Sequence, residues 1–476
     1  MSATTARPSS RQGILPFVMR YGDGETVTAH AGLPLVVEAA RAVRLDEVVE
    51  AQLQLAQRQR GFSEAEKFEA LLLLIAAGGD RIEDIRLLRD DRGLVRLLGG
   101  ELPSPDALLD FLAAFDDPAV WAQRPVDEKS WVPPETAPLA ALFEVNRALV
   151  RRAAQRHSTT ATLDHDGTII EAHKRDARVA YEGTKGYQPL VAVWAEQDLI
   201  VGDEFRDGNV PGNKDPLTSV RRAFAALPAW VERRCFRGDS ADYYEPLLKY
   251  LVQEQILFSI SADMSPELRA HCEAIPAAQW VELAVRERET VHVAEVEFTP
   301  GDWPKMAAPL RYVGLRITPR QADLLGERGL RYLAVVTNRP APADPARPCA
   351  DAMSAAELVQ WHWEKAGTIE HVHRSMKDEL GAGVLPSQRF GANAAWFRLN
   401  AITYNVLTLL KRHALPARLL SARPKRLRFE IFTVPARLVI HQSQLMANLS
   451  ASRERTEELV RARQRLLATR RSLLSA

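Results

Sequence analysis

The sequence predicts a mixed α/β fold with a helical region before it and a basic helical region after it. Three observations lead to this prediction. Residues 34–115 repeat their apolar positions with helical spacing and have glycines where the helices would end. Residues 159–261 alternate β-branched runs with amphipathic segments. Residues 291–337 contain three runs in strict apolar/polar alternation, which is typical of half-buried strands.

The central segment gives the more specific prediction. Strands are expected at 159–170, at 189–206 as an antiparallel hairpin, from 233, and at 256–261, with helices at 215–227 and 243–254. The order is three strands, helix, strand, helix, strand. That order matches a ribonuclease-H-like mixed sheet flanked by helices.

Composition shifts divide the chain into five predicted regions. A helical N-terminal domain covers 1–130, and 138–262 forms the first part of the ribonuclease-H-like core. A β-rich insertion at 263–350 ends in the linker P-A-P-A-D-P-A-R-P, and 351–412 completes the core. A basic helical region at 413–476 closes the chain. The N-terminal helices predict either a helix-turn-helix-like module that binds DNA ends or a plain helical bundle.

Composition excludes several other classes of protein. With 476 residues, 46% hydrophobic and 26% charged, the chain has ordinary globular values. It has no run of about 18 apolar residues, so we expect no membrane span. Three cysteines without paired spacing, and no apolar leader, favour a cytoplasmic location. The net charge of +1 conceals a basic tail, since residues 411–476 hold 15 Lys/Arg against 4 Asp/Glu. Such a tail favours either a polyanionic partner or a solvated helix.

Carboxylates are the candidate chemical groups. Asp164 and Asp166 are two apart on a predicted strand and therefore share one face, while Asp239 ends a later strand. Glu370 lies on a helix expected at 361–383, with Lys377 on nearly the same face roughly 10 Å further along. Converging carboxylates without Cys or His favour Mg²⁺ or Mn²⁺, and two such ions about 4 Å apart catalyse phosphodiester displacement. Asp239 as a helix N-cap, and Glu370 on a solvated face, are the plain alternatives.

Several motifs resemble those of bacterial insertion-sequence transposases with a DDE active site, in the group with an inserted β-domain and a Y-R-E-K signature. They are D-G-T-I-I, R-G-D-S-A-D-Y-Y and A-G-T-I-E-H-V-H-R-S-M-K-D-E-L-G. Y-E-G-T-K-G-Y-Q-P-L and L-P-S-Q-R-F-G-A-N-A-A-W-F-R-L-N-A-I-T-Y-N-V-L extend the similarity over about residues 60–412. The resemblance implies that Asp166, Asp239 and Glu370 are the metal-binding catalytic triad. It also implies that Lys377 contacts a DNA phosphate near the cleaved end. Asp164 remains an alternative ligand, or a hydrogen-bonding neighbour.

The chain departs from that signature at two positions. Trp363 stands at the tyrosine position and Ala366 at the arginine position, so one hydroxyl and one positive contact are missing. Arg374 or Lys365 is a candidate replacement for the positive contact, although Lys365 lies about 100° round the helix from position 366. Trp280 and Trp303 in the insertion are candidates for stacking on an unstacked base, with a core role as the alternative.

These features predict a transposase that cuts and joins DNA at the terminal inverted repeats of an insertion sequence. The resemblance implies two Mg²⁺ or Mn²⁺ ions, double-stranded DNA as partner, and a homodimer acting on paired ends. Two alternatives remain: a metal-dependent nuclease of the same fold, and a catalytically inactive domesticated protein that only binds DNA.

Overall fold

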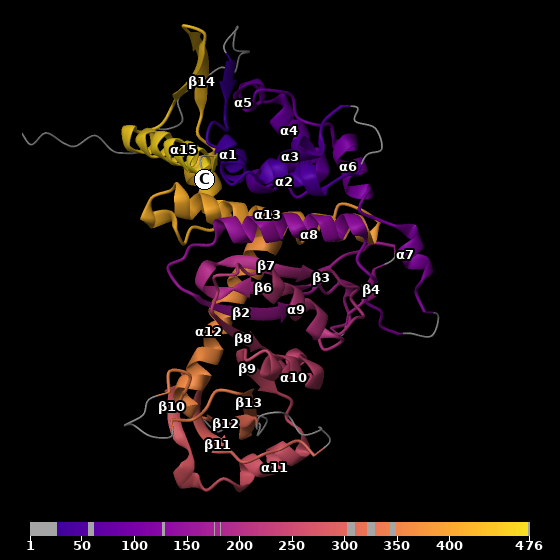
Figure 1. Cartoon of the computed structure of the whole chain (residues 1–476), viewed down its shortest axis with the longest axis vertical. Helices are drawn as coiled ribbons and strands as arrows, with labels where there is room; N and C mark the ends of the chain where they lie inside the picture. The colour runs from indigo at the N-terminus through magenta and orange to yellow at the C-terminus, as the bar shows by residue number, and fades with distance from the viewer. Residues whose placement is uncertain are drawn as a thin grey trace, which may run out of the picture.

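The protein is an elongated assembly of layers, seen here in a computed structural model (Figure 1). The structure describes residues 26–55, 61–125, 129–175, 177–180, 182–301, 310–320, 329–342 and 349–474. N-terminal helices and the C-terminal segment form one end, a layer containing α8 and α13 follows, and a large sheet leads to inserted strands at the other end (Figure 1). None of the helices in these ranges is long and apolar enough to cross a membrane.

The core half of the sheet has the predicted ribonuclease-H-like topology. Its strand order is β9-β8-β2-β6-β7. β6 pairs antiparallel with both β2 and β7, whereas β8 is parallel to β2 and to β9. The bounds are β2 (Thr160–Gly167), β6 (Leu190–Trp194), β7 (Leu199–Glu204), β8 (Arg233–Gly238) and β9 (Leu257–Ala262), with α9 (Pro216–Ala226) and α10 (Glu245–Gln253) as connections. The sequence therefore predicted the order and type of these five strands and two helices.

The β-rich insertion continues the core sheet instead of forming a separate one. β13 pairs antiparallel with β9, from Ala334 opposite Ala262 to Thr337 opposite Ser259. The added strands are β10 (Val281–Val285), β11 (Glu289–Val296), β12 (Arg311–Pro319) and β13 (Arg331–Thr337), and a helix, α11 (Pro266–Ala274), precedes them. Nine strands thus make one sheet. Alternation in the sequence revealed the strands, but it carries no information about which edge they join.

The N-terminal helices begin and end at chemical signals that the sequence contains. Ser63 and Glu66 form a capping box at the start of α3 (Glu64–Ala77), and Gly78 ends that helix with φ of +95°. The other helices are α1 (Pro34–Ala42), α2 (Leu45–Gln52), α4 (Ile85–Asp90), α5 (Arg92–Leu98), α6 (Pro105–Ala113) and α7 (Pro118–Ala122). Most of them pack into a core shared with later parts of the chain.

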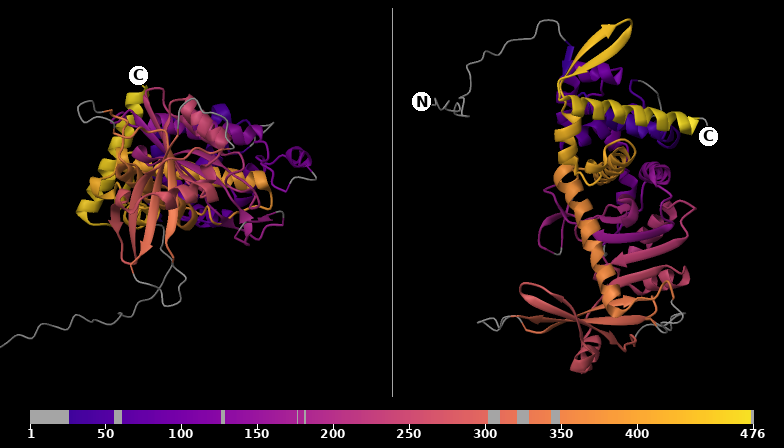
Figure 2. Two further views of the ribbon diagram at one scale, coloured as in Figure 1. Left: turned by 90° about the horizontal axis from the view of Figure 1, so that it is seen from below. Right: turned by 90° about the vertical axis from the view of Figure 1, so that its left-hand side faces the viewer.

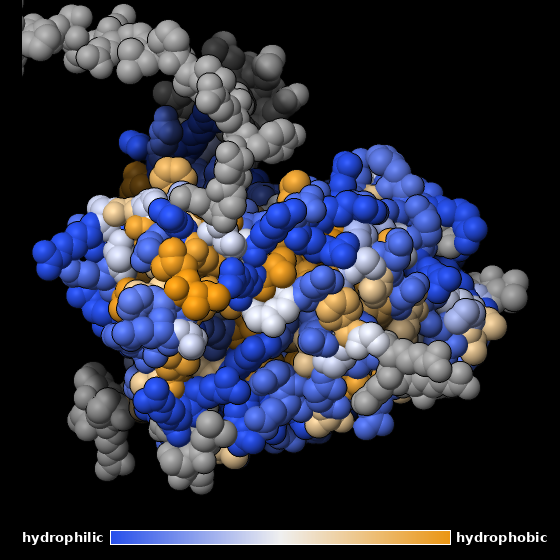
Figure 3. All heavy atoms as spheres, turned by 90° about the horizontal axis from the view of Figure 1, so that it is seen from above, coloured by the Kyte–Doolittle hydropathy of each residue, from blue (hydrophilic) through white to orange (hydrophobic). Residues whose placement is uncertain are grey.

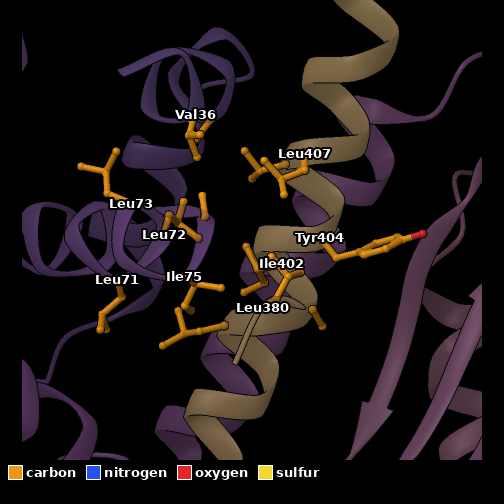
Figure 4. Close-up of a cluster of buried hydrophobic side chains, with 14 of the residues drawn as sticks. Val36, Leu71, Leu72, Leu73, Ile75, Leu380, Ile402, Tyr404 and Leu407 are labelled. Carbon is orange, nitrogen blue, oxygen red and sulfur yellow. The ribbon is translucent and has the colours of Figure 1, made fainter. Parts of the chain in front are cut away.

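That shared core is organised around α13 (Phe390–His413), which is buried over nearly its whole length. Leu72 and Ile75 of α3 face Ile402 and Leu407 of α13 (Figure 4). α8 (Ala137–Ala153) packs beside α13, and both helices contact β7 of the sheet. One apolar core therefore connects the N-terminal helices to the large sheet.

The C-terminal region is not wholly helical, contrary to the sequence prediction. β14 (Ala436–His441) and β15 (Gln444–Leu449) form a hairpin, and β1 (Thr26–Thr28) pairs with β14. Gln442 and Ser443 both have positive φ, as a two-residue hairpin turn requires. Only then comes the predicted basic helix, α15 (Arg453–Leu474), which packs on α1. Figure 3 views this end of the molecule and shows a mainly hydrophilic surface with scattered apolar groups.

We expect Arg398→Ala to destabilise the protein by about 3–5 kcal/mol. Arg398 is buried in α13, donates to both carboxylate oxygens of Asp203 at 3.0 Å, and pairs with Glu135 at 2.7 Å. Its removal leaves the fully buried Asp203 carboxylate without a counter-ion. Urea unfolding measures the change. The exposed Arg331, paired with Glu289, is the control, and Arg331→Ala should cost less than about 1 kcal/mol. Equal effects of the two substitutions would contradict this account.

Candidate active site

The two faces of β2 have different roles. Ala161 and Leu163 belong to the apolar core shared with α9 and α10. Asp164 and Asp166 alternate with them and face α12 (Ala355–Arg374), the long helix that runs along one side of the sheet (Figure 2). The two aspartates therefore share a face, as their spacing predicts.

Parallel pairing of β2 with β8 brings Asp239 to the same place. Asp164 is the register partner of Arg237, so Asp166 and Asp239 each lie two residues further along adjacent strands. Their carboxyl groups lie near each other, because the charge of Asp166 contributes to the raised pKa of Asp239. Asp239 also accepts a hydrogen bond from the backbone N–H of Ala241 at 2.9 Å. It therefore combines the N-cap role and the position beside Asp166 that the sequence left as alternatives.

The two carboxyl groups have opposite pKa shifts. Burial raises the pKa of Asp239, and the nearby charges of Asp242 and Asp166 add to this effect, so the value reaches about 6. Burial also acts on Asp166, but the His373 ring, 3.5 Å from its Oδ2, and the charge of Lys365 outweigh it and lower the pKa of Asp166 to about 2. Around pH 5 the pair consequently holds one proton and one negative charge.

α12 supplies a lysine and a histidine beside the aspartates. Lys365 Nζ lies 3.4 Å from Asp166 Oδ1, and His373 Nε2 lies 3.5 Å from Asp166 Oδ2. The two are eight residues apart, which places them about 80° apart round the helix and on one side of it. His371 lies elsewhere, where the charges of Asp198 and Lys411 act on it. Neither His373 nor Lys365 was expected beside the aspartates from the sequence.

Asp164 has a structural role. Arg237 donates to its two oxygens at 2.6 and 3.0 Å, and the Thr368 hydroxyl also donates to it. Arg237 further donates to the Trp361 carbonyl at 2.7 Å and pairs with Glu364 at 2.8 Å. Both Asp164 and Arg237 are buried. The Asp164 oxygens are thus engaged, which supports the hydrogen-bonding alternative over the ligand alternative.

Glu370 is on α12 but is exposed. It lies about 60° round the helix from His373, whose side chain contacts Asp166. Within the described ranges, no three His, Cys, Asp or Glu side chains are grouped as metal ligands. The structure therefore brings Asp166 and Asp239 together and leaves Glu370 outside their cluster, so its role stays a prediction.

The helix carrying Glu370 differs from the predicted one. It begins earlier, at Ala355, and α-helical geometry ends at Arg374, followed by a π-helical turn, η5 (Ser375–Glu379). Such turns recur at functional sites. Lys377 lies in this turn and donates to the Ile169 carbonyl at 2.8 Å and the Thr168 hydroxyl at 3.3 Å. Lys377 therefore holds the segment that directly follows Asp166. Gly381 ends the helix with φ of +86°, as predicted.

The remaining candidates lie apart from the aspartates. Arg374 is exposed. Trp363 packs toward the inserted strands, with the Arg286 guanidinium 4.8 Å from its ring centre. Trp280 is buried against Arg316 and Tyr332, in keeping with its core alternative. Trp303 lies outside the described residues.

Comparison with known proteins identifies the family. Residues 16–471 match the family described as transposase DDE domain group 1. The chain belongs to this family. The transposase is also similar to a solved structure described as a cryo-EM structure of piggyBac transposase synaptic complex with hairpin DNA. The TM-score is 0.41 with 12% sequence identity, covering 95% of this chain and 85% of that chain. A comparison with curated proteins finds no match.

The aspartate pair of the transposase fits the ligand chemistry of a divalent cation. Two partly buried carboxyl groups meet at adjacent strand ends, where burial and then the charges of Asp242 and Asp166 raise the pKa of Asp239. Oxygen ligands of this kind suit Mg²⁺ or Mn²⁺. Lys365 provides positive charge beside Asp166, and the His373 ring lies 3.5 Å from the other carboxylate oxygen.

We expect Asp239→Asn to stabilise the metal-free transposase by about 1–3 kcal/mol above pH 6. The folded protein retains the Asp239 proton up to about pH 6, whereas the unfolded chain loses it near pH 3.8. Stability contributed by this group is therefore lost as the pH rises from about 4 to 6, and the gain from asparagine should vanish below pH 4. Urea unfolding in chelator at pH 3.5 and 7.5 measures it, and asparagine retains the capping oxygen.

Asp166→Asn is the matched control, with the opposite sign. The pKa of Asp166 is lowered to about 2, so its ionised form stabilises the folded protein above pH 4, and this stability disappears as the pH falls toward 2. This substitution should destabilise the protein at pH 7.5. Destabilisation by both substitutions at pH 7.5 would show that the two carboxyl groups do not differ in this way.

Proposed function

We propose that this transposase cuts and joins DNA at the terminal inverted repeats of an insertion sequence, with two Mg²⁺ or Mn²⁺ ions. The observation that carries the proposal is the meeting of Asp166 and Asp239 at adjacent strand ends beneath α12. A pair of partly buried carboxylates at the ends of parallel strands, on a ribonuclease-H-like sheet, suits phosphodiester chemistry.

Asp166, Asp239 and Glu370 are the proposed metal ligands. When bound, the ions activate water or a 3′-hydroxyl and stabilise the departing oxygen. Glu370 lies three residues before His373, whose ring contacts Asp166. Its exposed side chain is therefore available to DNA and solvent on the helix that covers the aspartates. Arg237 keeps that helix in register with β2 and β8 through Asp164, Glu364 and the Trp361 carbonyl.

Lys365 and Lys377 are the proposed phosphate contacts nearest the aspartates. Ala366 leaves the helix without a positive side chain at that position. Lys365 brings an ammonium group within 3.4 Å of Asp166 and thus replaces the missing charge. Lys377 holds Thr168 and Ile169 beside the strand end. Arg374 is exposed one residue after His373 and adds positive charge on the DNA-facing side.

DNA is the proposed partner, bound by a homodimer on paired ends. The excess of Lys/Arg after residue 411 supplies sequence-independent affinity for phosphates, so binding should weaken steeply with salt. Trp363 lies between α12 and the inserted strands, a position from which it shapes the edge of the DNA path instead of touching the aspartates.

We expect Glu370→Gln to lower Mg²⁺-dependent cleavage of the element's own end DNA by roughly a hundredfold or more. The amide keeps the size of the side chain but removes the charge that a metal ligand needs. Gel assays of nicking and of strand transfer into a target plasmid measure the effect. Glu267→Gln, at an exposed glutamate of α11 in the insertion, is the control and should leave both reactions unchanged.

The same assays separate the alternatives. Cleavage without joining by the wild type would indicate a nuclease of this fold. A gel shift without nicking in Mg²⁺ would indicate a protein that only binds DNA. Equal cutting by wild type and Glu370→Gln would remove Glu370 from the mechanism.

A further inference from the structure

A cationic hollow follows α13, away from the aspartate pair. Short turns form it: η6 (Ala417–Leu419), α14 (Pro424–Leu427) and a π-helical turn, η7 (Arg428–Phe432). Its volume is about 820 Å³. The side chains that characterise it are Arg418, Arg423, Lys425, Arg426, Arg428 and Phe429.

Positive charge exceeds negative charge in this hollow. Five lysines and arginines line it against one acid, Glu430. Glu430 is shared by Arg418 and by Arg426, the latter at 2.7 Å, while Arg418 also pairs with Glu458 at 2.6 Å and Arg423 with Glu379. The Lys425 side chain is exposed and has no ion pair among the described residues, although its backbone N–H donates to Glu379 at 2.8 Å. The hollow therefore has an excess of positive charge, which favours the binding of an anionic partner.

Phe429 adds an aromatic surface to this charge. Its side chain is 80% exposed, whereas Leu427, Ile431 and Phe432 of the same segment are buried. The segment is therefore anchored by those three side chains, and Phe429 contributes little to the core. An exposed ring surrounded by cations is the combination that binds single-stranded nucleic acid, through base stacking and phosphate contacts. A duplex presents no free base face to such a ring.

The hollow is connected to the candidate active site by direct contacts. Lys377 binds Thr168, two residues after Asp166. Two residues after Lys377, Glu379 pairs with Arg423 and accepts from the Lys425 N–H. The Arg428 guanidinium donates to the Glu379 carbonyl and, at 2.9 Å, to the Ala76 carbonyl. A DNA strand that is separated from its complement at the candidate active site therefore lies next to a cationic surface that can bind it.

We propose that this hollow binds a single DNA strand, with a base stacked on Phe429 and phosphates held by Lys425 and Arg426. The proposal rests on the proposed function, because only a DNA-processing enzyme would present separated strands here. In this proposal, residues 418–433 bind single-stranded DNA, a function distinct from metal binding and from affinity for duplex DNA.

A fluorescent oligonucleotide tests the stacking. The probe is a dT oligomer with one central 2-aminopurine, whose fluorescence falls when the base stacks. Phe429→Ala should weaken binding about tenfold and abolish the fluorescence change, and Phe429→Trp should restore both. Leu333→Ala, at a half-exposed leucine of β13 in the insertion, is the control and should behave as wild type. Unchanged melting temperature shows that the Phe429 variants fold.

The contribution of the Lys425 and Arg426 charges to binding is tested with the same oligomer. Lys425→Gln combined with Arg426→Gln should weaken binding and reduce the salt slope by roughly one to two units. Arg269→Gln, at an exposed arginine of α11, should not. Binding that is equally strong in Phe429→Ala, or displacement of the oligomer by polyglutamate of equal charge, would overturn the proposal.

A blunt duplex distinguishes failure of this proposal from failure of the proposed function. If wild type binds and cleaves end duplex while Phe429→Ala binds the oligomer normally, only the stacking proposal is lost. If wild type binds neither the duplex nor the oligomer, both proposals are overturned.

Discussion

The candidate site depends on one buried guanidinium. Arg237, on β8, binds both oxygens of Asp164 on β2, and it also contacts the Trp361 carbonyl and Glu364 on α12. It thereby fixes two parallel strands and the helix across them relative to one another. Because Asp166 and Asp239 each lie two residues beyond this contact, their separation is set by the sheet and not by a flexible loop. A buried ion pair of this kind specifies geometry more than it adds stability.

Charge around the aspartates is balanced by the helix. Without Lys365 and His373, burial alone would favour protonated carboxyls at both positions. With them, Asp166 stays ionised while Asp239 takes the proton at mildly acidic pH. The two carboxyl groups differ because one faces α12 and the other faces Asp242. A divalent cation at this site would be coordinated by one ionised carboxylate and by one carboxyl group that loses its proton readily near neutral pH.

The arrangement of layers explains how distant regions are joined. α13 is buried on all sides because the N-terminal helices cover one face and the sheet covers another. Through η5, the same layer contacts the segment that contains Lys425 and Phe429. The inserted strands extend the other end of the sheet through β13. The N-terminal helices, the catalytic sheet and the insertion are consequently parts of one framework.

The sequence by itself determined the order of the core elements, the shared face of Asp164 and Asp166, and the position of Asp239 at a strand end. These follow from local periodicity and from residues such as Gly381 that end a helix. Only the tertiary structure decided the rest: the rotation of α12 that turns Lys365 and His373 toward Asp166, the π-helical turn at Lys377, the pairing of β13 with β9, and the pairing of β1 with β14. Each of these depends on contacts between residues far apart in the chain, and local periodicity does not encode such contacts.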